Sequence, residues 1–235
     1  MPLPFFFIED SFAAQGFITL NEDASRHIAQ VLRMKAGERL ELTDGRGHIV
    51  TAEITDGHKK KCVVKIEGTR HSVQSTRKVS IGISLLKNSN RFEWFLEKAT
   101  EIGVAEIIPL LCERTEKQHF RFERMKNILV SAMLQSQQAW LPELKVPVPV
   151  RDIIKQSHHS QKFIAHCMED AKIAMTDAIN PATDSQLILI GPEGDFSKEE
   201  IDYSLQYHFI PVTLGETRLR TETAGIVAAA FLAGQ

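Results

Sequence analysis

The chain has 235 residues, of which 43% are hydrophobic and 25% charged, and 28 Lys and Arg nearly balance 30 Asp and Glu for a formal net charge of −2. This composition excludes a disordered chain, and near-neutrality excludes a uniformly basic nucleic-acid coat protein. Cys62, Cys112 and Cys167 form no C-x-x-C pair, so we expect small core residues in a reducing compartment, the cytoplasm, and no metal site. Apolar runs fall short of the ~20 residues that span a bilayer, so we expect no membrane partner.

The first 72 residues predict a small β-barrel or sheet domain with one inserted helix. Asn21 is a predicted N-cap, because the acidic pair Glu22 and Asp23 follows it, and the helix is expected to end at Gly37. Turns at Asp44-Gly45 and Asp56-Gly57 favour hairpins. The expected strands are 5–8, 39–43, 48–55 and 62–67.

A polar stretch at residues 68–78 is typical of a linker, so we divide the chain into domains 1–72 and 73–235. Beyond it strands alternate with helices, which favours a mostly parallel sheet covered on both faces. The expected strands are 79–85, 106–112, 162–166, 187–190 and 211–214, and the expected helices are 92–103, 122–136, one starting at 198, and 222–232. The last helix is rich in Ala and Gly, which suits close helix packing.

Two segments combine the end of an apolar strand with glycine and polar residues. In the first, Gly191-Pro192-Glu193-Gly194 follows the strand, and Ser197 with Glu200 predicts a capping box. Glycines at the carboxyl end of a strand let backbone approach a ligand, and open α/β sheets bind ligands at that edge. The alternative is an ordinary strand–turn–helix connection.

The second segment runs from Val212 to Ala224 and repeats this pattern. Arg220, Thr221, Glu222 and Thr223 offer a cation, hydroxyls and a carboxylate at the start of a helix. Capping by Thr221 or Thr223 would explain one hydroxyl. It would leave Arg220 unexplained, because the helix dipole disfavours a cation at this end.

These segments resemble the signature loops of the SPOUT-class methyltransferases, specifically the RsmE family, which methylates N3 of a uridine in 16S ribosomal RNA of the small subunit. The segments 27–37 and 44–47 resemble its PUA-like RNA-binding domain, and 87–91, 97–104 and 107–110 resemble the entry to its catalytic domain. The run 134–138 keeps Gln135-Ser136 of a family motif but lacks the acid and base that flank them. Asp195 stands where a second glycine is common.

The resemblance implies an α/β fold with an N-terminal PUA-like β-barrel and a C-terminal α/β-knot (SPOUT, deep trefoil knot) domain, in a homodimer. It implies S-adenosylmethionine as cofactor and no metal. The implied cofactor-binding residues are His166, Met168, Leu189, Ile190, Gly191, Pro192, Glu193, Gly194, Leu214, Gly215, Leu219, Thr221, Thr223 and Ala224.

Methyl transfer to uridine N3 requires an aligned displacement and loss of the N3 proton. We assign Arg220 to stabilise the uridinate, while Glu222 or Glu193 would accept the proton or fix Arg220. The partner would be small-subunit ribosomal RNA, naked or in an assembled 30S particle. The expected RNA contacts are Arg26, Arg33, Lys35, Arg46, Lys59, Lys60, Lys61 and Arg91. For the lysine triplet the alternative is a solvated hairpin turn.

Two other functions remain compatible with the sequence. A SPOUT enzyme could act on another RNA or another base atom, and a non-catalytic RNA-binding factor could retain the fold. Arg220 and the two glycine loops argue against the second.

Overall fold

The computed structural model describes residues 3–9, 16–116 and 118–234. The chain forms two compact units: unit 1 comprises Met1–Gln74 and Met133–Leu141, and unit 2 comprises Ser75–Ala132 and Pro142–Gln235. Residues 133–141, which the sequence assigned to the second domain, therefore group with the first. None of the helices within the described ranges is long and apolar enough to cross a membrane.

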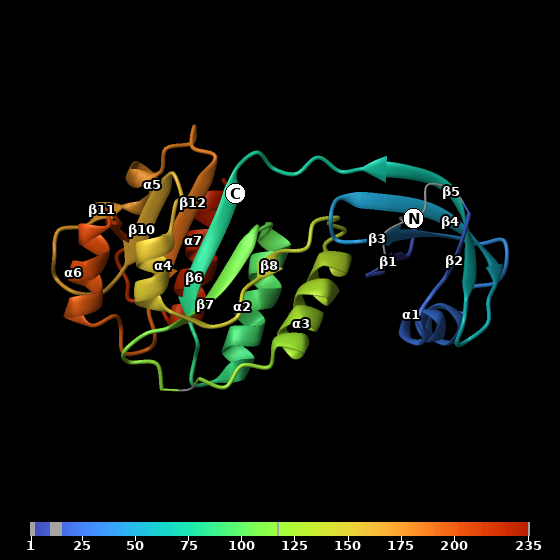
Figure 1. Cartoon of the computed structure of the whole chain (residues 1–235), viewed down its shortest axis with the longest axis horizontal. Coiled ribbons are helices and arrows are strands. Elements are labelled where there is room, and N and C mark those ends of the chain that lie inside the picture. Colours follow the sequence, from blue (N-terminus) through green and yellow to red (C-terminus); the bar gives the residue numbers. More distant parts are fainter. Residues whose placement is uncertain (1–2, 10–15, 117, 235) are drawn as a thin grey trace. The chain divides into compact units, whose positions relative to one another are not determined.

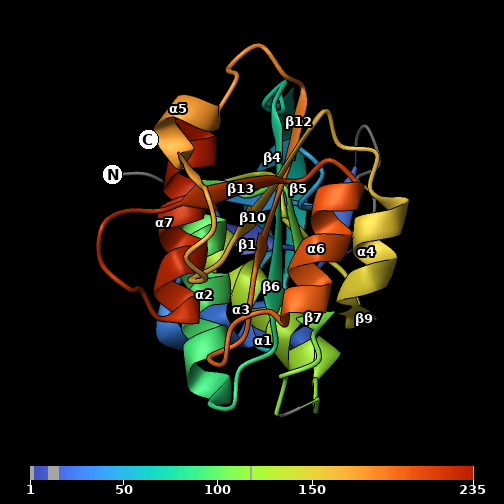
Figure 2. The same ribbon diagram turned by 90° about the vertical axis from the view of Figure 1, so that its left-hand side faces the viewer.

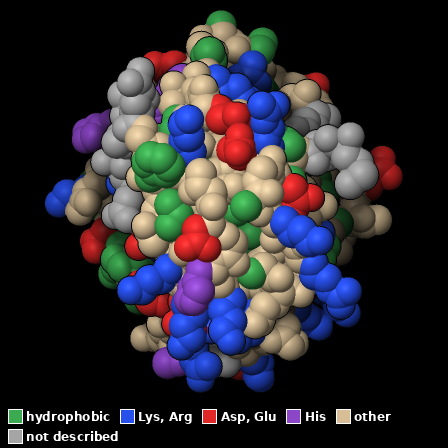
Figure 3. Space-filling model, turned by 90° about the vertical axis from the view of Figure 1, so that its right-hand side faces the viewer, with side chains coloured by type: hydrophobic (Ala, Val, Ile, Leu, Met, Phe, Trp, Pro, Cys, Tyr) green, Lys and Arg blue, Asp and Glu red, His purple; other side chains and the backbone are tan. Residues whose placement is uncertain are grey.

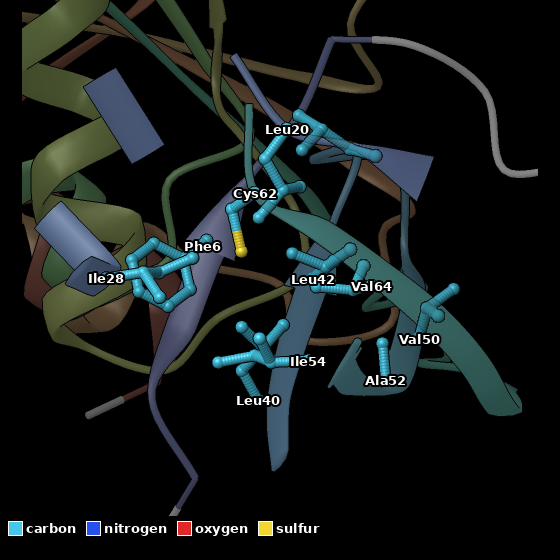
Figure 4. Close-up of a cluster of buried hydrophobic side chains, with 11 residues drawn as sticks. Phe6, Leu20, Ile28, Leu40, Leu42, Val50, Ala52, Ile54, Cys62 and Val64 are labelled. Atoms are coloured by element: carbon cyan, nitrogen blue, oxygen red, sulfur yellow. The ribbon is translucent and has the colours of Figure 1, made fainter. Parts of the chain in front are cut away.

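Unit 1 is built on a five-stranded sheet in the order β1-β3-β4-β5-β2, in which only the β1–β3 pair is parallel (Figure 1). Its elements are β1 (Phe5–Phe7), β2 (Phe17–Thr19), α1 (Glu22–Arg26), the π-helical η1 (His27–Val31), β3 (Arg39–Thr43), β4 (His48–Asp56) and β5 (Val63–His71). Alternate apolar residues of the strands face one core together with Ile28 (Figure 4). The four strands predicted at 5–8, 39–43, 48–55 and 62–67 are confirmed, and β2 was missed.

Two local predictions for unit 1 need correction. Asn21 does cap α1, accepting a hydrogen bond from the Ala24 amide at 2.9 Å, but the helix ends at Val31 instead of Gly37 because the backbone turns left-handed at Arg33, with φ +56°. The predicted linker is also shorter. β5 continues to His71 and the next strand begins at Lys78, so strand pairing outweighs the polar composition of 68–71.

Unit 2 contains an all-parallel sheet in the order β11-β13-β10-β12-β6-β7-β8, with β9 also paired to β7. Figure 2 shows α4 and α6 on one face and α2, α5 and α7 on the other. The elements are β6 (Lys78–Ser84), α2 (Ser89–Ile102), β7 (Glu106–Leu111), α3 (Phe122–Gln135), β8 (Glu143–Leu144), β9 (Val148–Pro149), α4 (Val150–Gln156), β10 (Gln161–Ala165), β11 (Ile173–Ala174), α5 (Met175–Ala178), β12 (Ser185–Ile190), α6 (Lys198–Gln206), β13 (Ile210–Thr213) and α7 (Thr221–Ala233).

The predicted strand–helix alternation is confirmed, while α4, α5 and the short β8, β9 and β11 were missed. β13 pairs with both β10 and β11, so a late strand inserts between two strands that precede it in the chain. The α7 helix then packs on α2. A β-carbon at Gly225 would lie 2.7 Å from a ring carbon of Phe95, so the predicted close packing of the small-residue helix depends on glycine there.

Candidate active site

Three segments of unit 2 line one pocket of about 620 Å³ at the carboxyl ends of its strands. They follow β10, β12 and β13, whose registers pair Ala165 with both Ile190 and Val212. Because parallel strands end at the same edge, the loops after them meet there. The volume lies within the range of small-molecule sites. The two glycine-bearing segments singled out from the sequence thus share one hollow.

The turn after β12 is tightly packed and fixed at both ends. A β-carbon at Gly191 would lie 3.1 Å from the Phe196 backbone nitrogen, closer than ordinary packing allows. At the other end, the Ser197 side chain accepts from the Glu200 amide and the Glu200 carboxylate accepts from the Ser197 amide. The predicted capping box is therefore confirmed.

Most of the implied cofactor-binding residues line this pocket. Those that do are His166, Ile190, Gly191, Pro192, Glu193, Leu214, Gly215, Leu219, Thr221 and Ala224. Met168, Leu189, Gly194 and Thr223 are not among its lining residues. Leu189 belongs to the core cluster and Met168 packs against it, while the Gly194 carbonyl accepts a hydrogen bond from Arg114 at 2.8 Å.

His166 is the most unusual group in the pocket wall. It is 7% exposed, and both ring nitrogens are buried without a hydrogen-bond partner in the structure. Burial lowers the pKa of its imidazole, and the nearby Lys172 ammonium lowers it further, against the opposing effect of Asp195 and Asp170. A neutral imidazole with unused donor and acceptor capacity in a pocket wall is suited to binding a polar ligand group.

Arg220 and Glu222 begin α7 but have different surroundings. Arg220 is the N-cap residue, its side chain is exposed, and among the described residues no hydrogen bond or ion pair involves its guanidinium. Neither threonine caps the helix, so the capping alternative is wrong. The Glu222 side chain is 8% exposed; its Oε1 lies 3.6 Å from Arg91 Nε, and its Oε2 has no hydrogen-bond partner.

The other candidate carboxylate, Glu193, lies in the pocket wall itself. Its side chain is exposed, and Oε1 accepts a hydrogen bond from the Lys87 amide at 3.1 Å. Arg91, which the sequence assigned to RNA binding, also lines the pocket from α2. The structure therefore brings Arg91, Arg220 and Glu193 to one pocket. The buried Glu222 carboxylate lies next to Arg91.

Sequence reasoning missed several residues of the pocket wall. They are Lys172, Asp195, Glu216, Thr217 and Arg218, whereas Cys167 belongs to the segment 166–168 that the resemblance implied as a third loop of the pocket. Cys167 is exposed, so the expectation of a core residue is wrong for this cysteine and right for Cys62 and Cys112. The departure from glycine at Asp195 was a usable signal. No signal in the sequence predicted the role of Lys172, whose ammonium donates to the carbonyls of His166 and Met168.

The remaining RNA-binding candidates lie in unit 1 and are exposed: Arg26, Arg33, Lys35, Arg46, Lys59, Lys60 and Lys61. The lysine triplet occupies the connection between β4 and β5. The face drawn in Figure 3 carries Lys and Arg in separate groups with acidic side chains between them, so positive charge on this face is local. Within the described parts of the chain no group of three or more His, Cys, Asp or Glu is placed to hold a metal ion.

Comparison with known proteins identifies both units. Residues 73–233 match the model of an RNA methyltransferase domain, and residues 20–67 match that of an RNA methyltransferase PUA domain. The chain is 30% identical over 236 residues to a ribosomal RNA small subunit methyltransferase E from Buchnera aphidicola, covering 96% of this chain and 91% of that protein.

Solved structures agree over the full length. A crystal structure described as a "probable rRNA-methyltransferase" from Porphyromonas gingivalis is 38% identical, with a TM-score of 0.90, covering 98% of this chain and 97% of that one. A ribosomal RNA small subunit methyltransferase E from Neisseria gonorrhoeae bound to S-adenosylmethionine is 27% identical, with a TM-score of 0.87, covering 97% and 95%. These matches confirm the expected fold class, an N-terminal PUA-like domain followed by a C-terminal α/β-knot (SPOUT) domain.

Proposed function

The chain belongs to the family of ribosomal RNA small subunit methyltransferases E (RsmE), and from this premise we propose that it transfers a methyl group from S-adenosylmethionine to N3 of a uridine in 16S ribosomal RNA. The observation that carries the proposal is one pocket of about 620 Å³ that gathers both glycine-bearing segments, a buried unpaired imidazole and Arg220. The proposal includes a homodimer, as the family resemblance implies, in the cytoplasm, as the cysteine content suggests, acting on naked RNA or an assembled 30S particle.

The chemistry of the pocket fits a nucleoside cofactor. Ile190, Val212, Leu214 and Leu219 offer apolar surface, and Gly191 and Gly215 line the pocket with backbone. No atom lies within 4 Å of the position that a β-carbon would take at Gly215, and His166 offers hydrogen bonds that it makes to none of the described protein groups. We assign these residues to holding S-adenosylmethionine, which when bound supplies an electrophilic methyl group on a sulfonium.

We assign separate roles in charge stabilisation, proton transfer and RNA binding to the charged residues. Arg220 is exposed at the pocket and has no acidic partner among the described residues, so its charge is available to a uridine that has lost its N3 proton. Glu193 lies in the wall with its second oxygen free, and we assign it to accept that proton. Glu222 is buried 3.6 Å from Arg91, and we assign it to hold Arg91 toward the RNA. The exposed cations of unit 1 would contact phosphates and position the substrate.

Substituting the two carboxylates by glutamine separates their roles. Glu193→Gln can keep the hydrogen bond from the Lys87 amide but removes the base, so we expect kcat to fall about a hundredfold and the pH dependence of kcat to change. Glu222→Gln removes only the charge facing Arg91, so we expect a higher KM for RNA with a smaller change in kcat. Single-turnover rates against pH and RNA concentration measure both. A large fall in kcat in Glu222→Gln, with only a change in KM in Glu193→Gln, would show that Glu222 accepts the proton.

The proposal as a whole is tested by mass spectrometry of nucleosides from ribosomal RNA of cells with and without the gene. Loss of N3-methyluridine in the deletion, restored by the wild-type gene, is the expected result. Persistence of that nucleoside with loss of another methylated one would indicate a SPOUT enzyme with a different target. Failure of the purified protein to bind S-adenosylmethionine at high micromolar concentration would favour a non-catalytic RNA-binding factor.

A further inference from the structure

Asp195 adopts a backbone conformation that favours glycine. Its φ is +65°, in the left-handed region, where a residue with a β-carbon costs about 1 kcal/mol or more and only aspartate, asparagine and glycine occur routinely. A strained residue persists where surrounding contacts over-determine it, and such positions cluster at ligand-binding sites. The contacts of the Asp195 side chain can offset this cost.

The carboxylate of Asp195 links two loops of the pocket that are 28 residues apart. Its Oδ2 accepts from the Cys167 amide at 2.8 Å, and its Oδ1 accepts from the Phe196 amide at 2.9 Å. Cys167 belongs to the loop after β10, and Asp195 to the turn after β12. Asp195 and Cys167 both line the pocket, so the first of these hydrogen bonds joins two segments of its wall.

Each loop is also held by a cation that donates to two of its carbonyls. The Lys172 ammonium donates to the His166 carbonyl at 3.1 Å and to the Met168 carbonyl at 2.6 Å, so it fixes the loop after β10 on both sides of Cys167. The Arg114 guanidinium donates to the Gly194 carbonyl at 2.8 Å and to the Phe196 carbonyl at 3.4 Å, on both sides of Asp195. Among these contacts, the hydrogen bond from the Cys167 amide is the one that joins the two loops directly.

We propose that Asp195 is a positioning residue that fastens the loop after β10 to the turn after β12 and thereby fixes the orientation of His166 in the wall of the cofactor pocket. The inference rests on the proposed function, because it assigns the pocket to S-adenosylmethionine. A carboxylate suits the task, since it accepts two amide hydrogen bonds at once and strengthens both by its charge.

Asp195→Gly tests the proposal because it removes the bridge while making the backbone conformation easier to adopt. We expect the dissociation constant for S-adenosylmethionine, measured by calorimetry, to rise about tenfold to a hundredfold, as loss of charge-assisted hydrogen bonds predicts. Hydrogen exchange at the Cys167 amide of the free protein should become faster. The melting temperature should fall only slightly, because glycine relieves the left-handed backbone while the two hydrogen bonds of the carboxylate are lost.

Two further variants complete the design. Asp195→Asn tolerates the left-handed backbone and keeps an amide oxygen as acceptor, so we expect it to retain most of the cofactor affinity. His208→Gly is the matched control: His208 has φ +63°, is exposed and does not line the pocket, so its replacement relieves the same backbone strain. It should leave cofactor affinity unchanged.

The outcomes separate this inference from the proposed function. The positioning role is overturned if wild-type protein binds S-adenosylmethionine, the dissociation constant of Asp195→Gly lies within twofold of the wild-type value, and hydrogen exchange at the Cys167 amide is unchanged. If wild-type protein binds no S-adenosylmethionine, the proposed function fails, and exchange at Cys167 still decides whether Asp195 joins the loops. An equal loss of affinity for S-adenosylmethionine in Asp195→Gly and His208→Gly would also overturn the inference. The loss would then come from the greater flexibility of a glycine backbone and not from the missing carboxylate.

Discussion

Arg220→Ala is expected to lower the methyl-transfer rate about a hundredfold or more, the usual cost of removing a group that stabilises charge developing in a transition state. The melting temperature should not change, because the Arg220 side chain is exposed and makes no hydrogen bond or ion pair with the described residues. Single-turnover kinetics with saturating RNA and S-adenosylmethionine would measure the rate, and calorimetry would verify that cofactor binding persists.

Two companion variants sharpen this experiment. Arg220→Lys keeps the positive charge but not the planar guanidinium, so it should recover part of the rate. Arg124→Ala removes an exposed arginine that pairs with Glu93 on the surface, and it should leave the rate unchanged. A rate near that of wild type in Arg220→Ala would refute the role given to this residue.

Gly47→Ala is expected to destabilise unit 1 by about 3 kcal/mol. The φ of Gly47 is +89°, and a β-carbon there would lie 2.4 Å from Trp140 Cζ2 and 2.9 Å from His71 Nε2. The left-handed backbone contributes about 1–2 kcal/mol of this cost, and the collision with the indole contributes a further ~1–3 kcal/mol as in overpacked cores. Denaturant unfolding followed by far-UV circular dichroism would measure the loss.

Gly37→Ala is the matched control for this prediction. Gly37 has the same φ of +89°, but no atom lies within 4 Å of the position that its β-carbon would take. It therefore reports the backbone cost alone, and the difference between the two variants gives the cost of the collision. In a Trp140→Ala background, Gly47→Ala should cost less stability than it does in the wild-type protein, because the indole with which its β-carbon collides is gone. Equal destabilisation by Gly37→Ala and Gly47→Ala would show that the indole does not constrain the turn.

Signals that act within a few residues were readable from the sequence. Asn21 caps α1, Gly103 ends α2 in the left-handed conformation and Ser197 forms the capping box with Glu200, each as predicted. These interactions span at most four residues, so the local pattern determines them. The two glycine-bearing segments were also placed correctly at the sheet edge, because parallel strands fix where their following loops lie.

Features that depend on distant contacts could not be read in the same way. The segment 133–141 has no pattern of its own that assigns it to unit 1; the Gly47 amide donates to the Ala139 carbonyl and the Leu141 amide to the Gly45 carbonyl, across more than 90 residues of sequence. The bridge from Asp195 to Cys167 spans 28 residues and is also beyond the range of a local pattern. Arg220 was expected beside a capping threonine, whereas the arginine itself occupies the N-cap position.

The return of residues 133–141 to unit 1 has a consequence for synthesis on the ribosome. Although the strands of this unit are complete once residue 71 has been made, the segment that packs against its Asp44–Gly47 turn emerges only some 70 residues later. The nascent first segment of unit 1 must then wait, with the site for Trp140 uncovered, while β6, α2, β7 and α3 are translated. Its folding cannot finish before residue 141 has left the ribosome.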